Sequence, residues 1–193
     1  MAASAAQTGG RSGLPGEVQK AMRRLFGSTA KQPASWFHTG VNLMECAEVL
    51  WEGKLADADL ARDPISVYTY GPVYTMFVGF AMENMLKGLA IAKDPGLIKA
   101  GTLAKELRTH DLGKLWELAG LKQLQTIRPR LERITSLVTA FGRCPVSLTE
   151  NQMLAQVNAW MFPDRSGIRA LWRIMCREGC RNVPDWVGWS ECK

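Results

Sequence analysis

Apolar residues recur at helical spacing along most of the chain, and they are densest from Tyr74 to Ala92. Near the middle of this stretch the polar exceptions are Glu83, Asn84 and Lys87, whose spacing places them on one narrow stripe of a helix. A helix that is apolar on most sides belongs at the centre of a bundle. We therefore expect residues 74–92 to form the most buried helix, with Pro72 in its first turn. Its charged and polar groups interrupt the apolar run too early for a membrane span.

Helical periodicity also covers the rest of the chain, and no sustained alternating pattern predicts a sheet. The whole pattern predicts an all-α, up-and-down bundle of five to six helices. We expect a disordered N-terminal arm at 1–15, a helical domain at 16–182 and a Trp- and Cys-containing tail at 183–193. Within the domain, the first stretch is expected to be a solvated amphipathic arm. The stretches around the central helix are 17–27, 36–52, 112–119, 128–142, 150–162 and 167–179.

Glu83 and Lys87 stand four residues apart, in the order that favours an ion pair on one helix face. The segment Thr109-His110-Asp111 precedes the next amphipathic run, which Thr109 or Asp111 would cap. We expect Glu83, Lys87 and His110 to share a hydrogen-bond network between two adjacent helices. Arg108, Asp111 and Arg143 are the binding residues predicted beside them.

Two interpretations of this cluster stay open. One is a buried polar network that fixes how the helices dock, with every member hydrogen-bonded. The other is a catalytic or phosphate-binding site in which Glu83, Lys87 and His110 act and Lys87 and Arg143 take an anion. No Gly-rich phosphate loop supports the second interpretation.

Three elements of the chain resemble the HEPN family when they are taken in order. AMENMLKGL matches the A-x-E-x-x-x-K signature of that family's central helix, and THDLGKL matches its His-Asp-Leu-x-x-Leu segment. FGRCP is similar to the later G-R-Y-P element, with Cys144 in place of Tyr. The resemblance covers roughly Trp36 to Pro145, about the size of one small helical domain.

Many HEPN proteins are metal-independent ribonucleases that use an Arg, a spacer of four to six residues and a His. In such a site the histidine moves protons and the arginine stabilises the charge on the phosphorane. This chain has two histidines, His38 and His110. The positions where the arginine would stand hold Lys31, Gln32 and Pro33 before the first histidine, and Leu103, Ala104 and Lys105 before the second. The usual nuclease motif is therefore absent.

The resemblance implies a helical module that binds RNA or a partner protein in a prokaryotic toxin–antitoxin or antiviral defence system. It also implies a homodimer, because HEPN domains commonly pair through their helices. The alternative is a metal-independent ribonuclease or nucleotide-acting enzyme with an unconventional site around Glu83, Lys87 and His110.

The net charge of +6 favours an anionic partner without identifying it. Four arginines in the last helical stretch stand four residues apart, so each is rotated by only about 40° from the one before. Like charges at this spacing repel, which indicates a counter-charge from acidic residues of the same protein or from phosphates. We expect these four side chains to form a basic surface that contacts RNA, together with Lys20, Arg23 and Arg24 or with a second protomer. The alternative is that the four arginines form a solvated face. The four, here called the arginine ladder, are Arg165, Arg169, Arg173 and Arg177.

The five cysteines form no disulfide-framework spacing, and the N-terminus has no secretory signal, so we expect reduced thiols in a cytoplasm. Cys176, Cys180 and Cys192 lack both a C-x-x-C pair and a nearby His, so we expect no metal site and no cofactor. Trp186 and Trp189 are expected to fold back onto an apolar groove or to fill one on a partner. Seven tryptophans also favour an interface.

Overall fold

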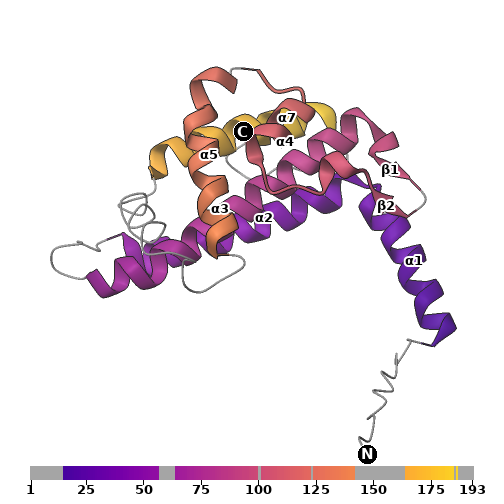
Figure 1. Cartoon of the computed structure of the whole chain (residues 1–193), viewed down its shortest axis with the longest axis horizontal. Helices are drawn as coiled ribbons and strands as arrows, with labels where there is room; N and C mark the ends of the chain where they lie inside the picture. Colours follow the sequence, from indigo (N-terminus) through magenta and orange to yellow (C-terminus); the bar gives the residue numbers. More distant parts are fainter. Residues whose placement is uncertain are drawn as a thin grey trace, which may run out of the picture.

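The computed structural model describes residues 15–56, 64–99, 101–122, 124–141, 164–184 and 186. Within these ranges the protein is an all-α bundle, as the sequence predicts (Figure 1). The α-helices are α1 (Gly16–Ala30), α2 (Pro33–Leu50), α3 (Pro64–Lys93), α4 (Leu112–Leu118), α5 (Leu124–Phe141) and α7 (Arg165–Asn182). A π-helical turn, η1 (Trp51–Leu55), continues α2. The stretch 150–162, which the sequence predicts to be helical, lies outside the described residues.

The long helix α3 is the centre of the bundle, and α2, α4, α5 and α7 all pack against it. Val78, Met82, Met85 and Leu86 are fully buried, which confirms that this helix forms the middle of the core. The prediction of its start was wrong, because α3 begins at Pro64 and Pro72 lies inside it. A proline inside a helix removes one backbone donor and costs about 3 kcal/mol. Helix α3 nevertheless continues through Pro72 and packs against η1, where the Trp51 ring lies 5.1 Å from that of Tyr74.

A small hairpin between α3 and α4 is the element that helical periodicity did not predict. The 3₁₀ turn η2 (Pro95–Leu97) leads into β1 (Ile98–Lys99), which pairs antiparallel with β2 (Thr102–Leu103). Gly101 has a φ of 74°, a left-handed conformation that glycine adopts without strain. A second 3₁₀ turn, η3 (Lys105–Leu107), then delivers the chain to α4. Strands of two residues are too short for a period-two pattern to be read.

The predicted apolar face of α7 is confirmed. Ile168, Leu171, Trp172 and Met175 are all buried. Trp186 also folds back into the core, with its ring edge-on to Phe37 at a centroid distance of 4.9 Å. Trp189 lies outside the described part of the chain.

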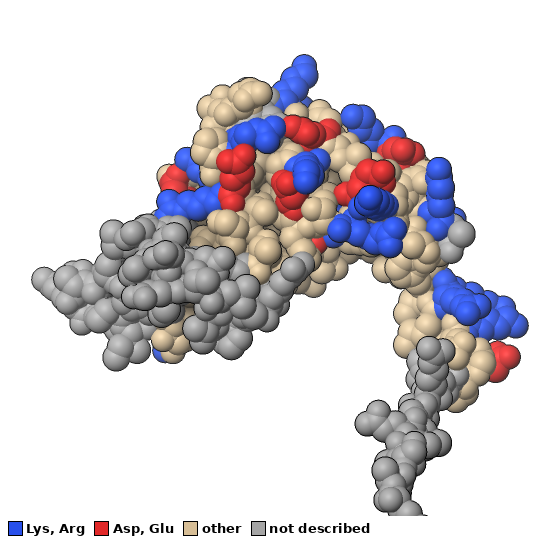
Figure 2. Space-filling model, viewed as in Figure 1, with Lys and Arg blue, Asp and Glu red and all other residues tan. Residues whose placement is uncertain are grey.

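Helix α1 projects from the body, and Ala30 is the residue of it that is buried (Figure 1). The stretch predicted at 17–27 is therefore an amphipathic helix, and its apolar face is exposed in the single chain. Basic and acidic side chains are intermixed over the visible face of the bundle (Figure 2). Among the described residues, no helix combines the length and the apolar character needed to cross a membrane.

Candidate functional site

The loop before α4 is held in place by local hydrogen bonds. The side chain of Asp111 caps α4 by accepting from the backbone N–H of Lys114, at 3.1 Å. The hydroxyl of Thr109 accepts from the backbone N–H of Asp111 at 3.0 Å, and the backbone N–H of Leu112 donates to Thr135 on α5. These bonds satisfy donors that a helix start leaves unpaired. They also fix His110, which lies between the two capping residues.

The structure brings Glu83, Lys87 and His110 together in one network. Lys87 Nζ donates to Glu83 Oε1 at 2.5 Å, along one face of α3. His110 Nδ1 lies 2.8 Å from Glu83 Oε2. The Glu83 and Lys87 side chains are 9% and 10% exposed, whereas that of His110 is 50% exposed. The carboxylate is therefore buried between two basic groups, and one of them reaches solvent.

The chemistry of this contact defines where the proton on His110 lies. An ionised carboxylate can only accept hydrogen bonds, so the Nδ1 atom of His110 must carry a hydrogen and donate it to Glu83. In the neutral imidazole the Nε2 atom is then the proton acceptor. The ring also meets the edge of Phe80 on α3, at a centroid distance of 6.3 Å. A histidine oriented by a buried carboxylate is an arrangement suited to proton transfer.

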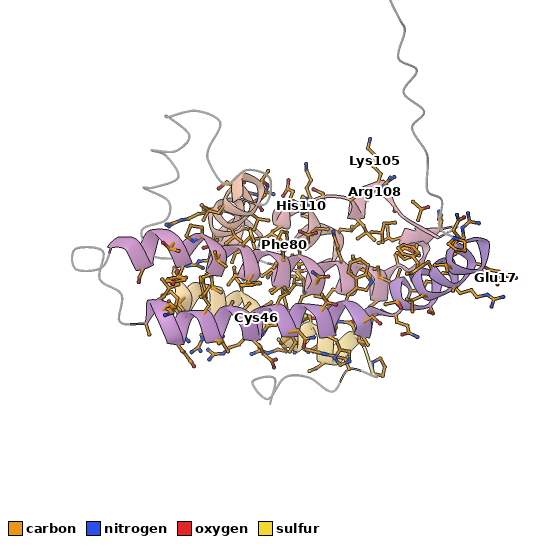
Figure 3. All side chains as sticks on the ribbon, turned by 90° about the horizontal axis from the view of Figure 1, so that it is seen from below. Glu17, Cys46, Phe80, Lys105, Arg108 and His110 are labelled. Carbon is orange, nitrogen blue, oxygen red and sulfur yellow. The ribbon has the colours of Figure 1, made fainter. Side chains whose placement is uncertain are left out.

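Further cations lie beside His110. Figure 3 shows Arg108 and Lys105 further along the same edge of the molecule. Both are exposed, and the Arg108 side chain makes no hydrogen bond or ion pair with any described residue. Arg143, the other arginine predicted for this site, lies outside the described residues.

Asp111, a predicted binding residue, is engaged in the helix cap. Burial alone raises the pKa of its carboxyl, but the hydrogen bonds and charge of Lys114 outweigh burial and lower it. The Lys114 ammonium also lies 3.3 Å from Asp111 Oδ2. These contacts with Lys114 satisfy the Asp111 carboxylate, so no ligand is needed to explain its position.

The arginine ladder does not form one open surface. Arg165 and Arg169 both bind the carboxylate of Glu48 on α2, the latter at 2.8 Å. Arg165 is also stacked 5.1 Å from the ring of Trp51. The predicted counter-charge is therefore an acidic residue of the same chain for these two arginines. Arg173 and Arg177 are exposed and remain the RNA-binding candidates of the ladder.

Glu48 is the charged residue of this region that the sequence did not single out. Its side chain is 13% exposed. Burial alone raises the pKa of Glu48, but the hydrogen bonds and charges of Arg165 and Arg169 outweigh it, so the pKa is lowered. The spacing of the arginine ladder predicted a nearby counter-charge but did not predict which residue supplies it. Near this network, the hydroxyl of Tyr74 is buried without a hydrogen-bond partner among the described residues.

Within the described ranges, no group of three or more His, Cys, Asp and Glu side chains is placed to hold a metal ion. Comparisons with models of protein families, with curated proteins and with solved structures found no match to the chain. The resemblance to the HEPN family therefore rests on the three sequence elements, of which the first two meet in the structure through Glu83 and His110.

Proposed function

We propose that this chain is a HEPN-like helical module that acts on RNA or a nucleotide, with His110 as a metal-independent acid–base group. The observation that carries the proposal is the hydrogen bond between His110 Nδ1 and the buried carboxylate of Glu83. This bond orients the ring and leaves its other nitrogen at the half-exposed edge. The Arg108 side chain, which has no partner among the described residues, supplies a positive charge for a phosphate.

For RNA, the proposed reaction is transesterification. His110 Nε2 takes the proton of a 2′-hydroxyl, and the 2′-oxygen attacks the adjacent phosphorus. The bond from phosphorus to the 5′-oxygen breaks, and the leaving oxygen takes a proton from water. The hydroxide that remains takes the proton from the His110 imidazolium, which restores both water and the base. The products are a 2′,3′-cyclic phosphate and a 5′-hydroxyl. General base catalysis of this kind typically contributes about 10² to 10⁴ in rate.

The test is cleavage of mixed RNA by the purified chain in the presence of EDTA. We expect the His110→Ala variant to lose about 10²-fold or more of the rate. The matched control is His38→Ala, because His38 is the other histidine of the chain and lies exposed on α2. Its rate should equal that of the unmodified chain. No cleavage by the unmodified chain, or equal cleavage by the two variants, would contradict the proposal.

A second candidate function is binding without chemistry, as a module for RNA or a partner protein in a toxin–antitoxin or antiviral defence system. It is favoured by the fact that Glu83 already has a hydrogen-bond partner on each carboxylate oxygen. This arrangement is also what a network for helix docking needs. In that case mixed RNA should bind without being cleaved, and Arg108→Ala should weaken binding.

A further inference from the structure

Helix α1 carries an exposed apolar stripe that takes no part in the candidate site. Val18, Met22, Leu25 and Phe26 are 39%, 57%, 60% and 38% exposed. They follow each other at i, i+4, i+7 and i+8, so they lie on one face of the helix. Large apolar side chains at this spacing are the usual anchors of a helix that packs against another helix.

Helix α1 also has little to stabilise it alone. It is 15 residues long, its start has no side-chain cap, and Gly16 and Gly27 weaken it further. Isolated helices of this length are marginal in water, and most helical stability in proteins comes from packing of the apolar face. The bundle buries Ala30 at the end of α1 but leaves the stripe open. The helix therefore gains stability if something packs on this stripe.

The positions that flank the stripe indicate what packs there. Val18, Met22, Leu25 and Thr29 follow the d-a-d-a order of a coiled-coil seam. In coiled coils the charges at the flanking e and g positions determine which helices pair, and in α1 these positions carry no charged side chain. The cations of α1 stand at b, c and f, on the far side of the helix. The flanking residues are Gln19, Ala21, Phe26 and Ser28, and the cations are Lys20, Arg23 and Arg24.

This distribution favours a second copy of α1. Two identical helices can meet along a neutral seam, because their cations point into solvent on opposite sides (the visible basic side chains of α1 are seen in Figure 2). A membrane surface or an acidic partner would instead be matched by cations beside the stripe. Self-pairing buries the exposed apolar residues without bringing like charges together.

A pocket at the base of α1 favours one direction of pairing over the other. It has a volume of about 220 Å³ and lies between α1, α2 and α3, where Phe26, Thr29, Trp36 and Asn84 line it. In an antiparallel pair with a and d positions facing, Met22 meets Leu25 of the partner subunit and Thr29 meets Val18 of the partner subunit. An apolar side chain then reaches the mouth of the pocket. A parallel pair would set two Thr29 side chains there.

We propose that α1 pairs antiparallel with α1 of a second copy of this chain, and that the end of each helix covers the pocket of the other subunit. The pocket matters because a short seam alone is small beside a standard interface, which buries about 1,600 Å². This surface is separate from the Glu83–His110 site. Dimerisation can therefore be lost while RNA cleavage is retained, and RNA cleavage can be lost while the dimer is retained.

The test is the mass of the full chain in solution, measured by light scattering over a concentration series. We expect twice the chain mass of 21.4 kDa for the unmodified protein and the single chain mass for the double variant Met22→Glu with Leu25→Glu. Losing two buried apolar anchors should raise the dimer Kd at least about a hundredfold. Both substituted residues are exposed in the single chain, so the bundle formed by α2 to α7 should stay folded, and the loss of helical content should be confined to α1.

The matched control is Val49→Glu, which places the same charge on an exposed apolar residue of α2, 72% exposed and outside the stripe. It should leave the dimer intact. A second control, Lys20→Glu with Arg24→Glu, changes the far face of α1 and should also leave it intact. A monomer at every concentration, or a dimer that survives the double variant, would overturn the proposal.

Discussion

Replacing Glu48 with glutamine tests the network that joins α2 to α7. The substitution keeps the shape of the side chain but removes the charge that Arg165 and Arg169 share. Breaking a fully buried ion pair costs about 3–5 kcal/mol. Here the two arginine side chains are 25% and 36% exposed, so water relieves part of the loss. We expect the free energy of unfolding to fall by about 1–3 kcal/mol.

The assay is urea unfolding followed by far-UV circular dichroism. Glu52→Gln is the matched control, because Glu52 lies 3.5 Å from the same Arg165 but is 69% exposed. A pair of this kind contributes at most about 1 kcal/mol. Equal losses of stability in the two variants would refute the view that burial of Glu48 decides its contribution.

The same comparison has a predicted pH dependence. The pKa of Glu48 in the folded chain is below its ordinary value of 4.5, so the folded state favours the ionised form. The stabilisation is therefore fully present above that ordinary value and is lost as the pH falls through the lower, folded pKa. The difference in unfolding free energy between the unmodified chain and Glu48→Gln should shrink on acidification. A difference that stays constant below pH 4.5 would contradict this assignment.

Two further predictions concern packing and RNA binding. Gly88→Ala should lower the free energy of unfolding by about 1–3 kcal/mol, because the added Cβ would lie 2.4 Å from an aromatic ring of α2. Gly71→Ala, on the same helix with no described atom within 4 Å of its added Cβ, is the control and should show no loss in urea unfolding. Arg173→Glu with Arg177→Glu should weaken RNA binding and flatten its salt dependence by about 0.7 for each single-strand contact removed, measured by fluorescence anisotropy. Arg181→Glu is the control on the same helix, since Arg181 pairs with an acidic residue three positions away. Unchanged RNA affinity in the double variant would mean that Arg173 and Arg177 have no role in binding.

The sequence predicted the central helix and its polar stripe because both depend on local spacing. Apolar residues on most sides of α3 require burial, and charges four residues apart on one helix must be neighbours. The capping signal of Asp111 likewise placed the start of α4. His110 could then be expected near Glu83 once α4 was packed on α3.

Contacts between distant segments could not be predicted in this way. Glu48 stands 117 residues before Arg165, and no local pattern indicates that their side chains meet. The early start of α3 was missed because Pro72 is a strong local signal for a helix start, whereas the packing against η1 that overrides it is tertiary. Local sequence preferences therefore predicted the helices, whereas tertiary packing determined which helices and side chains contact one another.

Measurements of unfolding free energy can show which members of the Glu83 network stabilise the fold and which do not. Glu83 and Lys87 are both buried, so Lys87→Ala would leave the buried carboxylate with the half-exposed imidazole as its described partner and should cost about 3 kcal/mol or more in urea unfolding. His110 is half exposed, and Glu83 keeps its partner on α3 when the imidazole is removed. His110→Ala should therefore cost less than about 1.5 kcal/mol, the net value of one hydrogen bond. If the two losses are equal, His110 is part of what allows Glu83 to be buried, and a loss of RNA cleavage in His110→Ala would reflect unfolding. If His110→Ala stays folded, a loss of RNA cleavage in that variant is a loss of chemistry and not of the fold, which is the result that the proposed acid–base role requires.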